Sequence, residues 1–263
     1  MKKVSIPVLK ALKDRQEKFA ALALYDAPMA AMAERCDIPV VLVGDSLGMT
    51  MLGFDSTVPV TMQHMIYHVE AVRRGNHRSL IIGDLPFMSY ATTDVAMQNA
   101  TAIMQAGAHM VKLEGGSWLC DTVERLSHCG IPVCAHLGLT PQSINKLGGY
   151  RVQGRDDAAA KKMVTDAMAL EQAGAELLVV ECVPMALAKT ITEKLSIPVI
   201  GIGAGRQCDG QILVINDIIG LTEKPPKFAK NFLCDANDIP AALKQFASDV
   251  RTGVFPAEEN TFT

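Results

Sequence analysis

Aromatic residues are scarce in this sequence, at 5% of 263 residues, although hydrophobic residues of all kinds make up 49%. A folded core must therefore consist mainly of aliphatic side chains. The length permits one or two domains of ordinary size, and single α/β barrels commonly reach about 250 residues. No linker-like, highly charged or low-complexity stretch divides the chain, so we expect one domain over residues 1–263.

The sequence also lacks any apolar run of the roughly 18 residues that a transmembrane helix needs. Its basic beginning, residues 1–7, is not followed by the apolar stretch of a secretory signal. The 25 basic and 28 acidic residues nearly balance, whereas a nucleic-acid-binding protein is usually basic. These absences favour a cytoplasmic protein that binds neither membranes nor nucleic acids.

The seven cysteines include no C-x-x-C pair, and their number is odd. Both features argue against a disulfide framework and against a structural zinc site. Buried, reduced thiols in a cytoplasmic protein are the better interpretation.

Eight short apolar segments recur along the chain, with longer helical patterns between them. Near-continuous apolar runs are typical of parallel strands covered on both faces. The expected strands span residues 21–24, 40–45, 80–84, 110–114, 132–136, 177–181, 199–203 and 212–217. Apolar residues at helical spacing predict helices over residues 61–74, 93–106, 157–173 and 184–195.

This alternation predicts an α/β fold, a (β/α)8 TIM barrel, with a doubly wound open sheet as the alternative. An extra helix over residues 8–18 is expected before the first strand. A further helix is expected over residues 236–252, followed by a loose tail over residues 253–263.

Polar residues gather at the carboxyl ends of the expected strands, where a barrel forms its active-site mouth. They are Asp45, Asp84, Glu114, His136, Glu181 and Asp217. Three carboxylates from the second, third and fourth strands would repel one another, and a divalent cation relieves such repulsion. Oxygen ligands without cysteine favour magnesium or manganese over zinc. For any one of these acids, a salt bridge or a helix cap is the structural alternative.

Lys112 lies two residues before Glu114, so both side chains occupy the same face of their strand. A lysine there can neutralise a substrate carboxylate or a developing enolate oxygen. A purely structural Lys–Glu bridge is the alternative. A Schiff base is less attractive, because nearby carboxylates keep the amine protonated.

Four further features carry predictions. Glu181, which ends the sixth strand, is placed to act as a general base, and His136 could bind substrate or serve only the structure. Residues 201–205, Gly-Ile-Gly-Ala-Gly, could bind an anion or only permit close packing. Residues 147–155 form either a mobile lid or a plain surface loop.

Several motifs, in order along nearly the whole chain, resemble the ketopantoate hydroxymethyltransferase family. The sequence carries them as Val43-Gly44-Asp45-Ser46-Leu47-Gly48, Gly83-Asp84-Leu85-Pro86-Phe87, Val111-Lys112-Leu113-Glu114-Gly115-Gly116, His136-Leu137-Gly138-Leu139-Thr140-Pro141-Gln142, Gly148-Gly149-Tyr150, Glu181-Cys182-Val183-Pro184 and Gly201-Ile202-Gly203-Ala204-Gly205. The resemblance implies a barrel like those of the phosphoenolpyruvate/pyruvate superfamily. It implies transfer of a hydroxymethyl group from 5,10-methylenetetrahydrofolate to 3-methyl-2-oxobutanoate, which gives 2-dehydropantoate on the way to pantothenate and coenzyme A.

The resemblance also implies roles for the strand-end residues. Asp45 and Asp84 would hold Mg2+, with Glu114 as a further ligand, directly or through water. The keto-acid site would comprise Asp45, Ser46, Asp84, Lys112 and His136. Glu181 would accept the proton whose removal forms a Mg2+-stabilised enolate. Homo-oligomers, typically decamers, are expected.

Two other functions stay open at this point. One is a metal-dependent carbon–carbon lyase or phosphonomutase of the same superfamily, which would not use folate. The sequence lacks the K-x-C-G-like loop that such lyases often carry. The other is a barrel that binds a metabolite without catalysis.

Overall fold

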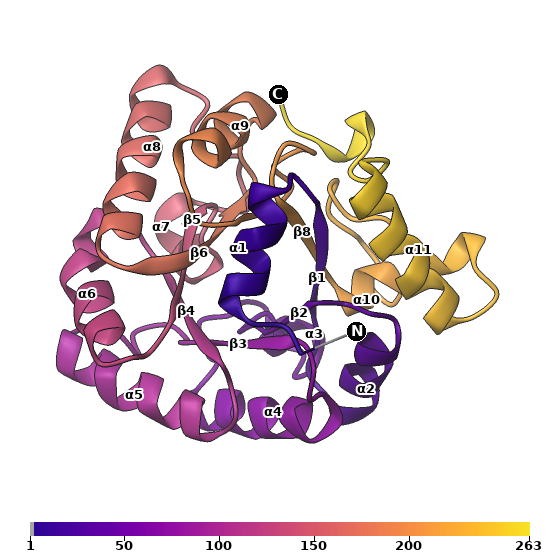
Figure 1. Cartoon of the computed structure of the whole chain (residues 1–263), viewed down its shortest axis with the longest axis horizontal. Helices are drawn as coiled ribbons and strands as arrows, with labels where there is room; N and C mark the ends of the chain where they lie inside the picture. The colour runs from indigo at the N-terminus through magenta and orange to yellow at the C-terminus, as the bar shows by residue number, and fades with distance from the viewer. Residues whose placement is uncertain (1–2) are drawn as a thin grey trace.

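The computed structural model describes residues 3–263 and contains a closed barrel of parallel strands (Figure 1). The strands pair in sequence order, and β8 closes the barrel against β1. Their bounds are β1 Phe19–Ala23, β2 Val40–Val43, β3 Leu80–Asp84, β4 Met110–Glu114, β5 Val133–Gly138, β6 Ala175–Glu181, β7 Val199–Ile202 and β8 Gly210–Val214. The barrel prediction is confirmed, and the open-sheet alternative is wrong.

Helices surround the barrel in Figure 1. Their bounds are α1 Ile6–Asp14, α2 Ala27–Arg35, α3 Leu47–Thr50, α4 Met62–Gly75, α5 Thr93–Gln105, α6 Cys120–His128, α7 Ile144–Leu147, α8 Asp157–Gln172, α9 Met185–Lys194, α10 Ile215–Ile218 and α11 Ile239–Thr252. The 3-10 helices are η1 Ser117–Leu119, η2 Pro141–Ser143, η3 Leu233–Asp235 and η4 Glu258–Asn260. Side-chain oxygens of Thr61, Thr92 and Asp156 cap α4, α5 and α8, close to the predicted starts.

Side chains alternate between two cores. Those facing the helices form the larger core, and those facing inward fill the barrel. On β6, for example, Leu177 and Val179 belong to the interior core, whereas Leu178 and Val180 pack outward. The same alternation turns the last residue of β6, Glu181, towards the interior.

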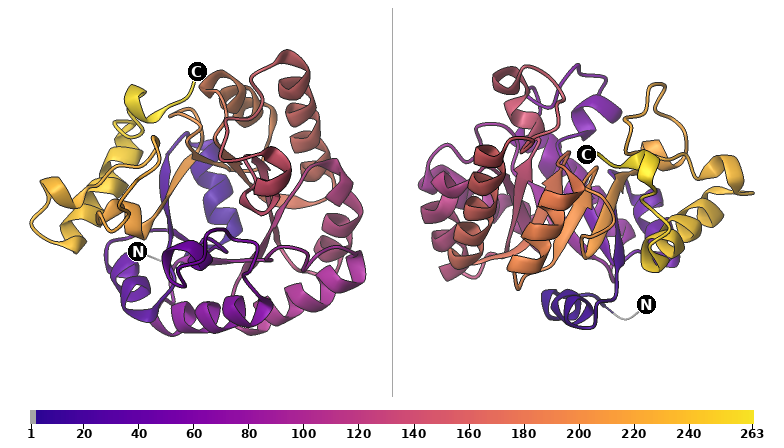
Figure 2. Two further views of the ribbon diagram at one scale, coloured as in Figure 1. Left: turned by 180° about the vertical axis from the view of Figure 1, so that it is seen from behind. Right: turned by 90° about the horizontal axis from the view of Figure 1, so that it is seen from above.

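Helix α1 covers the end of the barrel opposite the strand carboxyl ends (Figure 2, right). Leu9 of α1 is fully buried in the interior core, beside Phe19 and Ala21. The helix was expected over residues 8–18, but it begins at Ile6 because Pro7 favours the first turn and Ser5 precedes it. It ends at Asp14, before Gln16 turns the chain with a left-handed φ of 57°.

Two predictions near the carboxyl terminus are wrong. The last strand ends at Val214, and Asp217 lies in the short helix α10 instead of at a strand end. An apolar run cannot by itself distinguish a buried strand from a buried helical turn. Residues 253–263 are not a loose tail, because Phe255, Asn260 and Thr261 are buried.

Within residues 3–263, no helix is both long and apolar enough to cross a membrane.

Candidate active site

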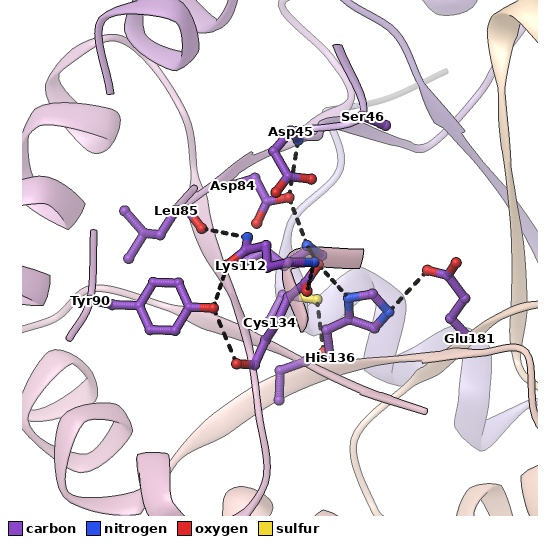
Figure 3. A network of polar contacts seen from close by, with 12 residues as sticks. Asp45, Ser46, Asp84, Leu85, Tyr90, Lys112, Cys134, His136 and Glu181 are labelled. Carbon is purple, nitrogen blue, oxygen red and sulfur yellow. Dashed lines mark hydrogen bonds and ion pairs between the residues drawn. The ribbon is translucent and has the colours of Figure 1, made fainter. Parts of the chain in front are cut away.

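Four predicted site residues form one inward row across three neighbouring strands (Figure 3). Asp84 of β3 is in register with Lys112 of β4, and Glu114 of β4 is in register with His136 of β5. Paired residues on parallel strands point to the same face, and so do residues two apart on one strand. The strand register therefore brings all four side chains to the barrel mouth.

The carboxylates of Asp45, Asp84 and Glu114 form a compact buried cluster. Each offers an oxygen within 4.8 Å of the others. The backbone N–H of Asp45 donates to Oδ2 of Asp84 at 3.2 Å. Oδ2 of Asp45 and Oδ1 of Asp84 are buried without a hydrogen-bond partner. Unpaired buried carboxylate oxygens facing one another suit a divalent cation with oxygen ligands.

Burial and mutual repulsion distort the titration of this cluster. Burial, followed by the charges of Asp84 and Glu114, raises the pKa of Asp45 well above its usual range. Burial likewise raises the pKa of Asp84, although Lys112 opposes this effect. Burial would also raise the pKa of Glu114, but Lys112 and His136 lower it to about 2. Of the three acids, Asp45 therefore lacks sufficient cationic compensation within the chain.

Lys112 supplies the positive charge that the other two acids share. Its Nζ lies 2.6 Å from Oδ2 of Asp84 and 3.0 Å from Oε1 of Glu114. Burial alone would lower its pKa, but the two carboxylates raise it well above the usual value. The amine is therefore protonated, which disfavours a Schiff base. The Lys112–Glu114 bridge considered from the sequence is present.

His136 joins the carboxylate cluster to Glu181. Its Nδ1 lies 3.2 Å from Oε1 of Glu114, and its Nε2 lies 3.2 Å from Oε2 of Glu181 (Figure 3). Burial would lower the pKa of the imidazole, but Glu114 raises it to about 9. Immediately after Glu181, Cys182 adopts a left-handed φ of 47°, an unusual conformation for a non-glycine residue. This turn ends β6 directly at the Glu181 carboxylate.

Two residues that hold Glu114 were not identified as site residues from the sequence. The backbone N–H of Gln142 donates to Oε2 of Glu114 at 3.1 Å. The hydroxyl of Tyr90 donates to Oε1 of Gln142 and to the backbone carbonyl of Glu114. Gln142 lies in one of the quoted motifs, so the motif was an available signal. Tyr90 lies outside the quoted motifs.

Ser46 has a partner that sequence reasoning also missed. Its Oγ lies 2.8 Å from the hydroxyl of Tyr25, which is buried just beyond the end of β1. His68 fixes the same segment, because its Nδ1 lies 2.7 Å from the backbone carbonyl of Tyr25. The position of Tyr25 beyond a strand end was the available signal. His64 and His68 serve helix α4 and its packing.

The glycine-rich segment after β7 is closely packed. A Cβ on Gly201 would lie 2.9 Å from Sγ of Cys208, and one on Gly205 would lie 2.5 Å from Cγ of Met185. These contacts account for the glycines without a bound anion. The segment over residues 147–155 crosses towards the β2 side, where the Tyr150 hydroxyl lies 3.2 Å from Sδ of Met49.

Solved structures of similar shape share the fold of this chain. A phosphonopyruvate hydrolase in complex with oxalate and Mg2+ has a TM-score of 0.63 at 14% identity, with 83% of this chain and 84% of that chain covered. A 2,3-dimethylmalate lyase of the PEP mutase/isocitrate lyase superfamily has a TM-score of 0.58 at 14% identity, with 79% and 80% covered. These solved structures therefore share the barrel fold of this chain.

Sequence relatives are much closer. A 3-methyl-2-oxobutanoate hydroxymethyltransferase from Saccharophagus degradans is 65% identical over 99% of this chain and 97% of its own length. One from Yersinia pestis (strain Pestoides F) is 56% identical over the full length of both chains. The family model for ketopantoate hydroxymethyltransferase matches residues 3–258. The chain belongs to the ketopantoate hydroxymethyltransferase family.

Proposed function

We propose that this protein transfers a hydroxymethyl group from 5,10-methylenetetrahydrofolate to 3-methyl-2-oxobutanoate, giving 2-dehydropantoate and tetrahydrofolate. Full-length relatives that bear the name of this activity support the assignment. The observation that carries it is the arrangement at the barrel mouth. The inward row lies beside Asp45, which joins its carboxylate cluster, and beside Glu181, which contacts His136. Such a set can bind an α-keto acid and remove a proton beside its carbonyl group.

The proposed metal is Mg2+, held by Asp45 and Asp84 with Glu114 as a third ligand. The unpaired oxygens of the two aspartates and the absence of sulfur among these three donors fit this ion. When bound, Mg2+ would act as a Lewis acid that acidifies the C–H next to the keto group. Direct and water-mediated binding by Glu114 are both compatible with the donor set.

The protein's own side chains would position and deprotonate the keto acid. Lys112 can attract the carboxylate or the enolate oxygen, and Ser46 can hydrogen-bond the same substrate from the β2 side. Glu181 would accept the C3 proton, while His136 holds its carboxylate towards the interior. Asp45, Asp84 and His136 complete the proposed keto-acid site.

The remaining steps are set by the chemistry of the two substrates. The carbanionic C3 attacks the methylene carbon of the folate and forms the new carbon–carbon bond. One of the two carbon–nitrogen bonds of that methylene carbon breaks as the carbon–carbon bond forms. Cleavage of the second carbon–nitrogen bond and addition of one water release the hydroxymethyl product and tetrahydrofolate. The site must therefore admit one water molecule after the carbon–carbon bond has formed.

The lyase or phosphonomutase alternative is less well supported. Solved structures named as lyases or mutases share only 13–16% identity with this chain and therefore speak only to the fold. A non-catalytic barrel would not need a base candidate beside the metal candidate.

We further predict cytoplasmic localisation and a homo-oligomer, by family resemblance a decamer, and a single domain over residues 1–263.

A proton-exchange assay in D2O tests the proposal in two stages. The protein with Mg2+ and 3-methyl-2-oxobutanoate should exchange the C3 proton, and added methylenetetrahydrofolate should then yield 2-dehydropantoate. Exchange without product on adding the folate would exclude the hydroxymethyltransferase and favour another enolate enzyme. Absence of both exchange and product would favour the non-catalytic barrel.

A further inference from the structure

The rim of the barrel mouth is unusually apolar for an exposed surface. Large exposed hydrophobic side chains occur in the segments that follow β2, β3, β4 and β5. They are Met49, Met51, Phe87, Met88, Trp118 and Tyr150. The floor beneath this rim is strongly polar, since it holds the carboxylate cluster and Lys112. A polar floor below an apolar rim suits a small anionic substrate on the floor and a larger, flatter substrate at the rim.

Tyr150 connects opposite parts of this rim. It follows β5, yet its hydroxyl lies 3.2 Å from Sδ of Met49, which follows β2. Strands β3 and β4 lie between those two strands in the barrel. The contact therefore spans the side of the mouth where Asp84 and Glu114 end their strands. In the left view of Figure 2, which is turned to the reverse side, the segment containing α7 lies in front of the strands.

The charges of two carboxylates at the barrel mouth also act on the Tyr150 hydroxyl. Partial burial, followed by the charges of Glu181 and Asp45, raises the pKa of the Tyr150 hydroxyl. Tyr150 is nevertheless 55% exposed, so much of its surface is available to a ligand. The side chain thus contacts Met49 and still exposes about half of its surface to solvent.

The segment that carries Tyr150 is basic. Lys146, Arg151 and Arg155 are exposed, and within residues 3–263 none of them forms an ion pair with a carboxylate. Gly148 and Gly149 beside Tyr150 have left-handed φ values of 69° and 120°. We call residues 146–155 the roof segment. It combines an exposed aromatic ring in contact with Met49 with three cations that have no carboxylate partner among residues 3–263.

We propose that the roof segment binds the one-carbon donor, with the planar pterin ring against Tyr150 and Met49 and the glutamate carboxylates at Arg151 and Arg155. This inference rests on the proposed hydroxymethyltransferase function. The keto acid is small and polar and belongs on the floor, so the donor must reach it from the mouth, beneath the roof segment. A folate has a flat ring at one end and carboxylates at the other, and the roof segment offers an aromatic side chain and basic side chains within ten residues.

Substitution of the aromatic residue tests the ring contact. Tyr150→Leu should raise the KM for 5,10-methylenetetrahydrofolate about tenfold, the size of one lost stacking contact, while the KM for 3-methyl-2-oxobutanoate changes less than about twofold. Tyr150→Phe should retain most of the folate affinity. Tyr67 on α4 is an exposed aromatic residue outside the rim, so Tyr67→Leu is the matched control. Equal folate KM values for Tyr150→Leu and Tyr67→Leu would overturn the ring contact.

Substitution of the cations tests the carboxylate contact. Tetrahydrofolate and its triglutamyl form serve as probes in titrations with Mg2+ and the keto acid present. The unsubstituted protein should bind the triglutamyl form several-fold more tightly at low salt, and Arg151→Gln/Arg155→Gln should lose this preference. Arg125→Gln on the outer helix α6 is the control. A preference that survives in the double variant would overturn the carboxylate contact.

The measurements distinguish a wrong function from a wrong folate site. If the unsubstituted protein makes no 2-dehydropantoate, the proposed function is wrong. If it makes the product and neither set of roof-segment variants alters folate binding, only the roof assignment is wrong.

Discussion

Nε2 of His136 lies 3.2 Å from Oε2 of Glu181, so the residue proposed as the base is held by an imidazole on the neighbouring strand. The other ring nitrogen of His136 faces Glu114. One side chain therefore couples the proposed base to the proposed metal site. A single imidazole thus serves both carboxylates.

Glu181→Gln should abolish proton removal while leaving the keto-acid site intact. Loss of a general base costs about 10²- to 10⁴-fold, so C3 exchange into D2O should fall by that factor. Titration of 3-methyl-2-oxobutanoate with Mg2+ should give a dissociation constant within about threefold of the original. Exchange at the normal rate would rule out Glu181 as the base.

Metal-free protein should lose stability as the pH rises towards 9. The folded pKa of His136 is raised from 6.5 to about 9, so its contribution is complete below pH 6.5 and disappears as the pH passes through about 9. A shift of this size corresponds to at most about 3 kcal/mol. Urea unfolding in EDTA at pH 6.5 and 9.5 should show the loss in the unsubstituted protein. His136→Gln should reduce the difference in the free energy of unfolding between the two pH values. If both proteins lost the same stability between pH 6.5 and 9.5, His136 would not be its cause.

Asp45→Asn should stabilise the metal-free protein and weaken Mg2+ binding. Burial and its acidic neighbours raise the pKa of Asp45, so its ionised form opposes folding at neutral pH. The uncharged amide should therefore raise the free energy of unfolding of the metal-free protein by roughly 1–3 kcal/mol. Saturating Mg2+, at about 100 times its dissociation constant, should stabilise the unsubstituted protein by about 2.7 kcal/mol and the variant much less.

Asp217→Asn provides the matched control for that experiment. Asp217 is also a buried acid, but it is outside the cluster and accepts a hydrogen bond from Thr222. Its variant should keep the full Mg2+-dependent stabilisation in thermal unfolding. A similar loss in both variants would mean that the cluster is not the metal site.

Lys112→Met should be strongly destabilising in the absence of metal. The substitution leaves Asp84 and Glu114 buried without their shared cation, and breaking such a pair costs about 3–5 kcal/mol. Unfolding in EDTA measures this cost, and Mg2+ should recover part of it by supplying positive charge. A variant as stable as the original protein would show that the carboxylates are compensated elsewhere.

Tyr25→Phe tests whether Tyr25 positions Ser46. Loss of the 2.8 Å contact to Oγ should cost about 0.5–1.5 kcal/mol, which corresponds to a several-fold rise in the KM for the keto acid. We expect kcat to change less, since Glu181 and Lys112 are untouched. In Ser46→Ala protein the same tyrosine substitution should have little further effect. Additive effects of the two substitutions would contradict a shared role.

Most of the barrel could be predicted because its strands are nearly continuous apolar runs that end in polar residues. Lys112 and Glu114 could be placed on one face by counting residues, and the register with Asp84 and His136 followed from a closed parallel barrel. The end of β8 could not be predicted, because the apolar run of residues 212–215 continues from the strand into the first turn of α10 without a change in polarity.

The partners of the site residues were harder to predict than the residues themselves. Tyr25 reaches Ser46, and Gln142 reaches Glu114, through loop conformations that no spacing rule describes. The tail was missed for a related reason. Asn260 donates through its side-chain amide to backbone carbonyls of Lys227 and Ala229, and this contact depends on the path of a distant segment.

The ladder pairing of Asp84 with Lys112 and of Glu114 with His136 has a consequence for protein engineering. The floor of the pocket is specified by backbone pairing within the barrel, whereas the roof segment lies in a connecting loop. The two parts are separable modules. A roof segment transplanted from another family member should change the affinity for the folate donor without rebuilding the acid–lysine–histidine floor.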